Sequence, residues 1–228
     1  MKTKKVKVKV KKKKLKIKNI ILTIIFITIL ITSISYIINL PIKNIYISGN
    51  NLVKDHEIIQ LAHLENYPPY IKTYFSNIKN NLKQNEYIKN VSIKRKINGK
   101  IYLDIEEYQP LYIYQDKLVL SSSVKVDNTY QIDYVPYVIN NIDDIYQEFT
   151  TAFSKINKDI IYKISHIEYS PNEVDKERFI FYMVDSNYTY ITLNKIEKIN
   201  KYNSIVNELE GKKGIIYLDS GDYVEIKG

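Results

Sequence analysis

The chain has 228 residues, of which 34 are basic and 25 acidic, giving a formal net charge of +9. It contains no cysteine, which excludes disulfide bridges, thiolate nucleophiles and thiolate metal sites. Residues 1–18 hold 11 lysines and no acidic residue, so the remainder has 23 basic against 25 acidic residues, a net charge of −2. The excess of basic residues lies in this leader. The rest of the chain has a slightly negative net charge, so electrostatic attraction does not favour its binding to nucleic acid.

Residues 19–40 follow the leader and contain no charged side chain over 22 positions. A helix of this length reaches roughly 33 Å at about 1.5 Å per residue, enough to cross a hydrocarbon core of about 30 Å. The lysines predict that residues 1–18 stay in the cytoplasm and that the chain after residue 40 lies outside. A cleaved signal peptide is the alternative, but its apolar core is only about 7–15 residues long and ends in a small-residue cleavage site. We therefore expect an uncleaved membrane anchor.

The next stretch, residues 41–108, predicts a strand, two helices and two further strands. The apolar patterns predict strands over 43–48, 87–97 and 100–108, and helices over about 54–64 and 71–84. Gly49-Asn50 predicts a sharp turn after the first strand, and Asn98-Gly99 predicts a hairpin between the last two. The stretch is therefore expected to form a small α+β domain.

This order of elements, and the motifs within it, resemble the POTRA domain of the FtsQ/DivIB family of cell-division proteins. The residues that carry the resemblance include Gly49, Asn50, Arg95, Glu107 and Pro110. The chain departs from the family pattern at Ile97-Asn98-Gly99, where proline is usual. The resemblance implies an α+β chain in four parts: a basic cytoplasmic leader (1–18), a single transmembrane helix (19–40), a β-α-α-β-β POTRA domain (41–108) and a mixed β-rich domain with flanking helices (109–228).

Alternating apolar residues continue after residue 109 and predict most of the β-rich domain as strands. The expected strands are 111–114, 118–120, 135–139, 164–169, 178–184, 188–193, 214–218 and 222–226, with a loop and a short strand over 121–133. Helices are expected over about 143–155 and 195–209, where apolar residues lie on one stripe.

The final stretch, 214–223, resembles the end of the family's β domain, which in the family is the side that contacts partners. The matching partner-binding residues are Tyr217, Leu218, Asp219, Gly221 and Tyr223. A plausible mode is strand addition, in which an exposed sheet edge pairs with an extended segment of the partner. The alternative is that Ile215, Ile216 and Leu218 are ordinary core residues of a strand.

Candidate catalytic residues are few. His56 and His63 would share a face of one continuous helix, so a weak surface metal site is the alternative to two solvated histidines, and His166 is expected on a strand surface. Adjacent carboxylates such as Glu106-Glu107 and Asp143-Asp144 point to different sides and do not form a facing pair. We expect no catalytic, cofactor-binding or metal-binding residue, and thus a protein that is not an enzyme.

The resemblance implies a bitopic, type II protein of the cell membrane that acts as a scaffold at the division septum. Its partners would be small bitopic coiled-coil division proteins of the FtsL and FtsB/DivIC types and the septal peptidoglycan synthesis machinery. The 22 tyrosines reflect codon bias for the most part, and a binding interface for those near the C-terminal strands. Two alternatives remain: a POTRA-containing scaffold of another envelope or secretion complex, and an anchored extracellular hydrolase.

Overall fold

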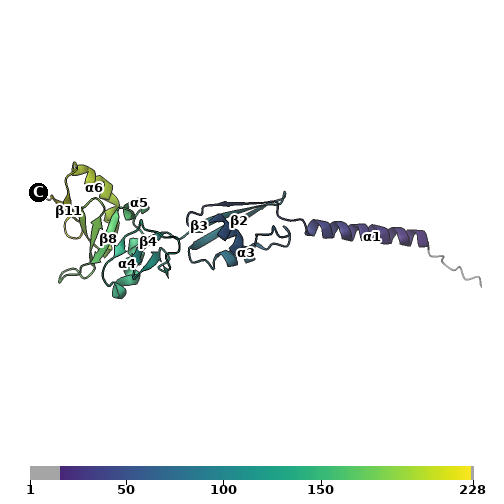
Figure 1. Ribbon diagram of the computed structural model, residues 1–228, viewed down its shortest axis with the longest axis horizontal. Helices are drawn as coiled ribbons and strands as arrows, with labels where there is room; N and C mark the ends of the chain where they lie inside the picture. The colour runs from purple at the N-terminus through teal and green to yellow at the C-terminus, as the bar shows by residue number, and fades with distance from the viewer. Residues whose placement is uncertain (1–15, 227–228) are drawn as a thin grey trace, which may run out of the picture.

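The computed structural model describes residues 16–226, which form an elongated molecule (Figure 1). A long helix, α1 (Ile17–Ile38), lies at one end, a three-stranded sheet in the middle and a nine-stranded sheet at the other end. Residues 1–15 of the predicted basic leader lie outside the described residues. The predicted α+β fold class, with an apolar N-terminal helix and a β-rich C-terminal region, is confirmed.

The apolar helix α1 begins and ends two residues earlier than predicted. It is the only helix among the described residues that is long and apolar enough to cross a membrane, and none of its residues is buried against the protein. Thr23, Thr28 and Thr32 each donate a hydrogen bond to the carbonyl four residues earlier, at 2.9, 2.9 and 3.0 Å. These bonds satisfy the threonine hydroxyls within the helix, as a lipid environment requires.

The domain that contains the middle sheet has the predicted order of strand, helix, helix, strand, strand. Its elements are β1 (Asn44–Ser48), α2 (Asp55–Leu61), α3 (Phe75–Leu82), β2 (Ile88–Lys96) and β3 (Lys100–Glu107). β3 lies in the centre, parallel to β1 and antiparallel to β2. Ile58 of α2 and both Ile78 and Leu82 of α3 are buried and cover one face of this sheet.

Both helices of this domain are shorter than predicted. α3 starts only at Phe75, and the segment before it is tied to the end of α1 by the Tyr70 amide, which donates to the Leu40 carbonyl at 2.8 Å. α2 ends at Leu61, and His63 beyond it has a φ of 53°. The prediction that His56 and His63 share a face of one helix is therefore wrong.

The second sheet contains nine strands in the order β12-β11-β10-β9-β8-β7-β4-β5-β6. They are β4 (Pro110–Tyr114), β5 (Lys117–Leu120), β6 (Lys125–Val126), β7 (Tyr137–Val138), β8 (Ile164–Tyr169), β9 (Arg178–Met183), β10 (Tyr188–Thr192), β11 (Gly214–Tyr217) and β12 (Tyr223–Ile226). Each predicted strand is present. The pairs β4–β7, β7–β8 and β10–β11 are parallel, so crossover connections carry the helices back over the sheet.

Helices cover one face of this sheet. They are η1 (Asp143–Ile145), α4 (Tyr146–Phe153), α5 (Lys158–Ile161), η2 (Leu193–Lys201) and α6 (Tyr202–Glu208), where η marks a 3₁₀ helix. The rings of Phe149 and Phe153 on α4 lie 4.5 Å from Phe179 and 5.8 Å from Phe181 of β9, respectively. These aromatic pairs form the centre of the C-terminal core.

The two sheets are joined by contacts as well as by the chain. The Tyr87 hydroxyl, at the start of the β2 hairpin, donates to the Asp127 carbonyl at 2.7 Å. The Tyr130 hydroxyl donates to Glu57 of α2 at 2.9 Å, and the Tyr87 and Tyr130 rings meet edge to face at 4.8 Å. The loop that follows β6 therefore packs against the first domain.

Candidate partner-binding edge

The strand β12 forms one edge of the nine-stranded sheet. It pairs with β11 in the antiparallel register that sets Tyr217 opposite Tyr223, and no other described strand pairs with its outer side. An edge strand of this kind presents a row of backbone N–H and C=O groups to which another strand can bind. Tyr223, Glu225 and Ile226 of β12 are exposed, which leaves the edge open to solvent.

Gly214 brings β12 close to β11. A Cβ atom at this position would lie 2.6 Å from the Glu225 carbonyl oxygen, a distance that real Cβ atoms do not adopt. The Gly214 amide also donates at 2.8 Å to the side chain of Asn187, which is fully buried and in turn donates to the Tyr202 hydroxyl at 3.1 Å. The edge pair therefore depends on a glycine and on one buried asparagine.

The turn between β11 and β12 is held by three cations from neighbouring elements. Arg178 donates to the Asp219 carboxylate at 2.8 Å, with both side chains mostly buried. Lys195 donates to the Asp219 carbonyl at 2.5 Å, and Lys198 pairs with Asp222 at 2.6 Å. The Lys198 bond holds the pKa of the Asp222 carboxyl below its usual value. These contacts fix the turn relative to β9 and η2.

The face of the sheet away from the helices carries a run of tyrosines, which we call the tyrosine face. Alternation and register place there Tyr137, Tyr182, Tyr188, Tyr190, Tyr217 and Tyr223, one or two from each strand between β7 and β12 except β8. The rings of Tyr190 and Tyr217 stack at 5.2 Å, those of Tyr217 and Tyr223 stack at 4.6 Å, and Arg178 lies 4.1 Å over Tyr190. A half-exposed aromatic ladder therefore leads to the open edge.

The opposite side of the same edge contains a hollow of about 270 Å³, which we call the edge groove. Apolar side chains of Ile205, Ile216, Leu218 and Val224 line it, together with Tyr223 and the charged residues Lys198, Lys201, Glu208 and Asp222. The groove lies between α6, η2 and the β11–β12 hairpin. The open edge thus has an aromatic surface on one side and an apolar hollow with charged neighbours on the other.

The five residues predicted to bind a partner differ in their accessibility. Gly221 is exposed, Tyr223 is 46% exposed, and Tyr217 is half-buried within the ladder. Leu218 is only 4% exposed, and the Asp219 side chain is taken up by Arg178, so neither side chain is free at the surface. The alternative that Leu218 is a core residue therefore describes its side chain correctly, and Ile216 is buried in the same way.

The motif residues of the first domain have a different role. Gly49 has a φ of 82°, and a Cβ there would lie 2.2 Å from the Ile105 carbonyl oxygen. The Glu107 carboxylate accepts hydrogen bonds from the amides of three successive residues, Asn51, Leu52 and Val53, at 2.9–3.1 Å. Asn50 closes the same turn, with its side chain donating to the Val53 carbonyl at 2.9 Å. Gly49, Asn50 and Glu107 therefore form one structural unit.

Arg95 and Pro110 lie apart from that unit. The Arg95 guanidinium donates to the Thr73 carbonyl at 2.5 Å and lies 4.6 Å from the ring centres of both Tyr70 and Phe75. It fixes the segment before α3 against β2. Pro110 opens β4, where the register to β5 shifts, so it marks the passage from one sheet to the other.

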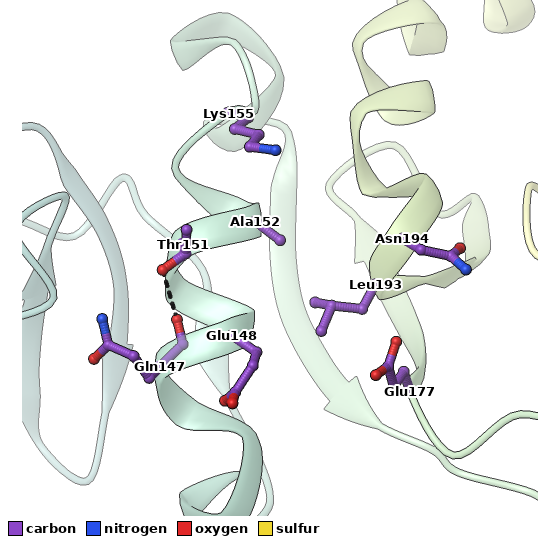
Figure 2. A pocket seen from close by; sticks show the side chains of 8 residues that line it. All are labelled: Gln147, Glu148, Thr151, Ala152, Lys155, Glu177, Leu193 and Asn194. Atoms are coloured by element: carbon purple, nitrogen blue, oxygen red, sulfur yellow. Dashed lines mark hydrogen bonds between the residues drawn. The ribbon is translucent and has the colours of Figure 1, made fainter.

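The described residues offer no constellation for catalysis. A hollow of about 410 Å³ lies beside α4, where Ala152 and Leu193 point toward one another (Figure 2). Thr151, which lines the hollow, donates to the Gln147 carbonyl of its own helix at 2.8 Å. Glu177, which directly precedes β9, lines the other side (Figure 2). No group of three or more His, Asp or Glu side chains able to hold a metal ion occurs within residues 16–226.

The predictions for the adjacent carboxylates Glu106-Glu107 and for His166 are confirmed. Glu106 pairs with Lys89 at 2.7 Å on the exposed side of β3, whereas Glu107 binds backbone amides, so the adjacent carboxylates do point to different sides. His166 is exposed on β8, as predicted, next to the ring of Tyr137. Sequence reasoning missed Arg178 and Tyr190, whose distance along the chain from Tyr217 hides their contact with the ladder.

The chain is similar in sequence to known cell-division proteins. Residues 40–108 match the model of the FtsQ-type POTRA domain. The chain is 26% identical over 212 residues to the cell division protein DivIB of Brevibacillus brevis, covering 87% of this chain and 79% of that one. It is 25% identical over 193 residues to DivIB of Bacillus subtilis, covering 81% and 73%.

Shorter matches extend to FtsQ and to a solved structure. The cell division protein FtsQ of Rickettsia felis is 28% identical over 74 residues, which cover 32% of this chain and 28% of that one. The major extracytoplasmic domain of DivIB from Geobacillus stearothermophilus is 18% identical with a TM-score of 0.38, covering 46% of this chain and 96% of that domain.

Proposed function

The chain resembles the FtsQ/DivIB cell-division proteins, and on this premise we propose that it is a non-catalytic scaffold of the division septum that binds its partners at the β12 edge. α1 would cross the cell membrane once, with the N-terminus in the cytoplasm and both sheets outside, as the leader lysines favour. The partners are small bitopic coiled-coil division proteins of the FtsL and FtsB/DivIC types, and through them the septal peptidoglycan synthesis machinery.

The observation that carries the proposal is the open edge between two recognition surfaces. An extended segment that pairs with β12 would point its side chains alternately to the two faces of the sheet. One set would meet Tyr223 and Tyr217 of the tyrosine face, and the other would enter the edge groove beside Val224 and Ile216. Backbone hydrogen bonds would supply affinity, and the two surfaces would select the sequence.

The tyrosine face is suited to such binding because its rings are already ordered. Stacking between Tyr190, Tyr217 and Tyr223 fixes these rings before a partner arrives, which reduces the entropy lost on association. Tyr217 also donates a hydrogen bond to Glu225 at 3.2 Å, and desolvation followed by this bond raises the pKa of its phenol.

The division role can be tested by localisation. An N-terminal fluorescent fusion of the full chain should gather at midcell in dividing cells. A signal that stays uniform around the membrane of dividing cells would exclude a septal role.

The binding site can be tested separately with two matched substitutions. We expect Tyr223→Lys to remove co-purification of FtsL-type and DivIC-type partners with the full chain, because it places a charge at the open edge. Tyr137→Lys changes a ring of nearly equal exposure, 45% against 46%, at the far end of the tyrosine face and should leave co-purification intact. Equal binding by both variants would reject the β12 edge as the partner site.

A further inference from the structure

The end of the first domain nearest α1 has a surface unlike the rest of the outer chain. Three segments meet there: residues 39–43 just after α1, residues 67–74 before α3, and residues 94–100 around the β2–β3 hairpin tip. Figure 1 shows this hairpin directed toward the end of α1. Together the three segments contain six basic and no acidic residue, whereas the chain after residue 18 has a net charge of −2.

Hydrogen bonds tie all three segments to the point where α1 ends. The Tyr70 amide donates to the Leu40 carbonyl at 2.8 Å, and Lys72 donates to the Asn39 side chain at 2.7 Å. The Lys43 amide donates to the Gly99 carbonyl at 2.8 Å, which fixes the hairpin tip beside the same stretch. The Tyr70 hydroxyl donates to the Lys96 carbonyl and so joins the second segment to the third.

These bonds set the depth of the surface relative to a membrane. Bilayers are about 40–45 Å thick with a hydrocarbon core of about 30 Å, so each headgroup layer is roughly 5–8 Å deep. Asn39 and Leu40 directly follow the last residue of α1, Ile38, and therefore lie at the headgroup layer when α1 crosses the bilayer. Tyr70 and Lys72, which bond to them, lie at that depth too.

The exposed side chains match what such a layer binds. Ile97 at the hairpin tip is 103% exposed, and Ile71 is 46% exposed, although both are large and apolar. Tyr67 and Tyr74 are 50% and 66% exposed on the same loop. Tyrosine favours the membrane interface, and apolar side chains beside lysines are typical of surfaces that lie in it.

The lysines at this end have no acidic partner among the described residues, so their charges can attract an anionic group. The five ion pairs among residues 16–226 involve none of Lys43, Lys72, Lys96 and Lys100. Lys96 and Lys100 instead lie 5.0 and 5.6 Å over the rings of Tyr102 and Tyr46. Lysines near a membrane surface are attracted by the phosphates of anionic lipids.

We propose that this membrane-proximal surface docks onto the phospholipid headgroups of the outer leaflet, with Ile97 and Ile71 inserted and the lysines bound to anionic lipid. Docking would hold the first domain against the membrane and so fix the direction in which the C-terminal sheet extends from it. The inference rests on the membrane crossing by α1 but not on the division role or on the β12 edge.

The absence of tryptophan from the sequence allows a direct test with a single reporter. The full chain with Ile97→Trp is reconstituted into vesicles containing phosphatidylglycerol, with or without bromine on the acyl chains. Val174→Trp is the matched control, because Val174 is also apolar and 96% exposed but lies in the loop before β9. Flotation with the vesicles first verifies that α1 has inserted, so a failed crossing is recognised separately.

We expect the Ile97→Trp emission to shift to the blue and to be quenched by brominated lipid, while Val174→Trp emits as a solvated residue and is not quenched. Ile71→Trp should behave as Ile97→Trp does and serves as the second reporter. Emission from both reporters equal to that of Val174→Trp in floated vesicles would overturn the proposal.

A separate set of variants tests the role of the lysines. Adding Lys43→Glu and Lys96→Glu to Ile97→Trp should reduce the quenching, and vesicles of phosphatidylcholine alone should reduce it likewise. Quenching that is unchanged by both would overturn the binding of anionic lipid. Quenching through brominated acyl chains also separates a lipid from a soluble polyanion, which carries no such label.

Discussion

The motif residues of the first domain have their hydrogen-bonding groups satisfied within the domain, whereas the end strand of the second sheet has an outer side unpaired with any described strand. In the first domain, Gly49, Asn50 and Glu107 stabilise one turn: the Glu107 carboxylate accepts three backbone amides beside Gly49, where a Cβ atom would clash with the Ile105 carbonyl. At the end of the second sheet, β12 pairs on one side alone and Tyr223 stays exposed. The motif residues of the first domain therefore stabilise its fold, whereas recognition, in the proposed binding mode, would fall to a strand whose outer backbone groups are unpaired within residues 16–226.

This contrast separates stability from binding. Substitutions in the Gly49–Glu107 unit should lower the free energy of unfolding and affect partners only through folding. Substitutions at the open edge should affect partners and leave stability nearly unchanged, because the exposed half of Tyr223 contributes little to the core. The following predictions run from the largest expected effect to the smallest.

Gly49→Ala should be the most destabilising change. The left-handed φ of 82° and the 2.2 Å approach to the Ile105 carbonyl both oppose a Cβ atom. We expect a loss of about 3–5 kcal/mol in the free energy of unfolding, measured by thermal melting of the detergent-solubilised chain. Gly211→Ala is the matched control: its φ is 84° but nothing lies within 4 Å, so the loss should be only about 1–2 kcal/mol. Equal losses would mean that the close approach is unimportant.

Glu107→Ala should cost about 2–3 kcal/mol, because the amides of Asn51, Leu52 and Val53 lose a charged acceptor. Glu106→Ala on the neighbouring position removes an ion pair with Lys89 that is about half exposed on both sides, and should change stability by less than about 0.5 kcal/mol. Denaturant unfolding of the two variants side by side measures the difference. A loss for Glu106→Ala as large as that for Glu107→Ala would contradict this role of the carboxylate.

Alkaline pH should weaken the C-terminal sheet. A hydrogen bond to Glu168, followed by burial, raises the pKa of Tyr182 to about 12, and burial followed by a Tyr162 interaction raises that of Tyr134 to about 12. Because these folded-state values exceed the ordinary 10.0, their contribution to stability is complete below pH 10 and is lost as the pH rises toward 12. Melting temperatures measured across this range should fall, and Glu168→Gln should reduce the fall. A flat profile would contradict the raised values.

Local patterns in the sequence predicted the elements well, with informative exceptions. One helix was predicted over about residues 195–209, and the second half of it is the α-helix α6. The first half, η2, is a 3₁₀ helix, and its buried residues Leu193, Ile196 and Ile199 recur every third position. A spacing of three matches the 3.0 residues per turn of that helix and could have been read in advance. The Asn98-Gly99 turn was predicted correctly, with a φ of 80° at Gly99.

Contacts between distant segments could not be predicted in the same way. Glu107 lies more than 50 residues from the amides that it binds, and no local pattern encodes that pairing. Alternation in β10 placed Tyr188 and Tyr190 on one face, but their alignment with Tyr217 depends on the parallel pairing of β10 with β11 across a helical crossover. The sequence therefore predicted an interface of tyrosines near the C-terminal strands, but it did not predict which rings stack or the presence of the edge groove.

Hydrogen exchange at β12 tests the central claim most directly. The amides of residues 223–226 on the open side should exchange rapidly in the full chain alone, and should become protected when an FtsL-type and DivIC-type partner complex is added. The amides of β2, at the edge of the first sheet, serve as the internal control and should not change. Protection that appears at β2 and not at β12, or at neither strand in a complex that still co-purifies, would contradict binding by strand addition at this edge.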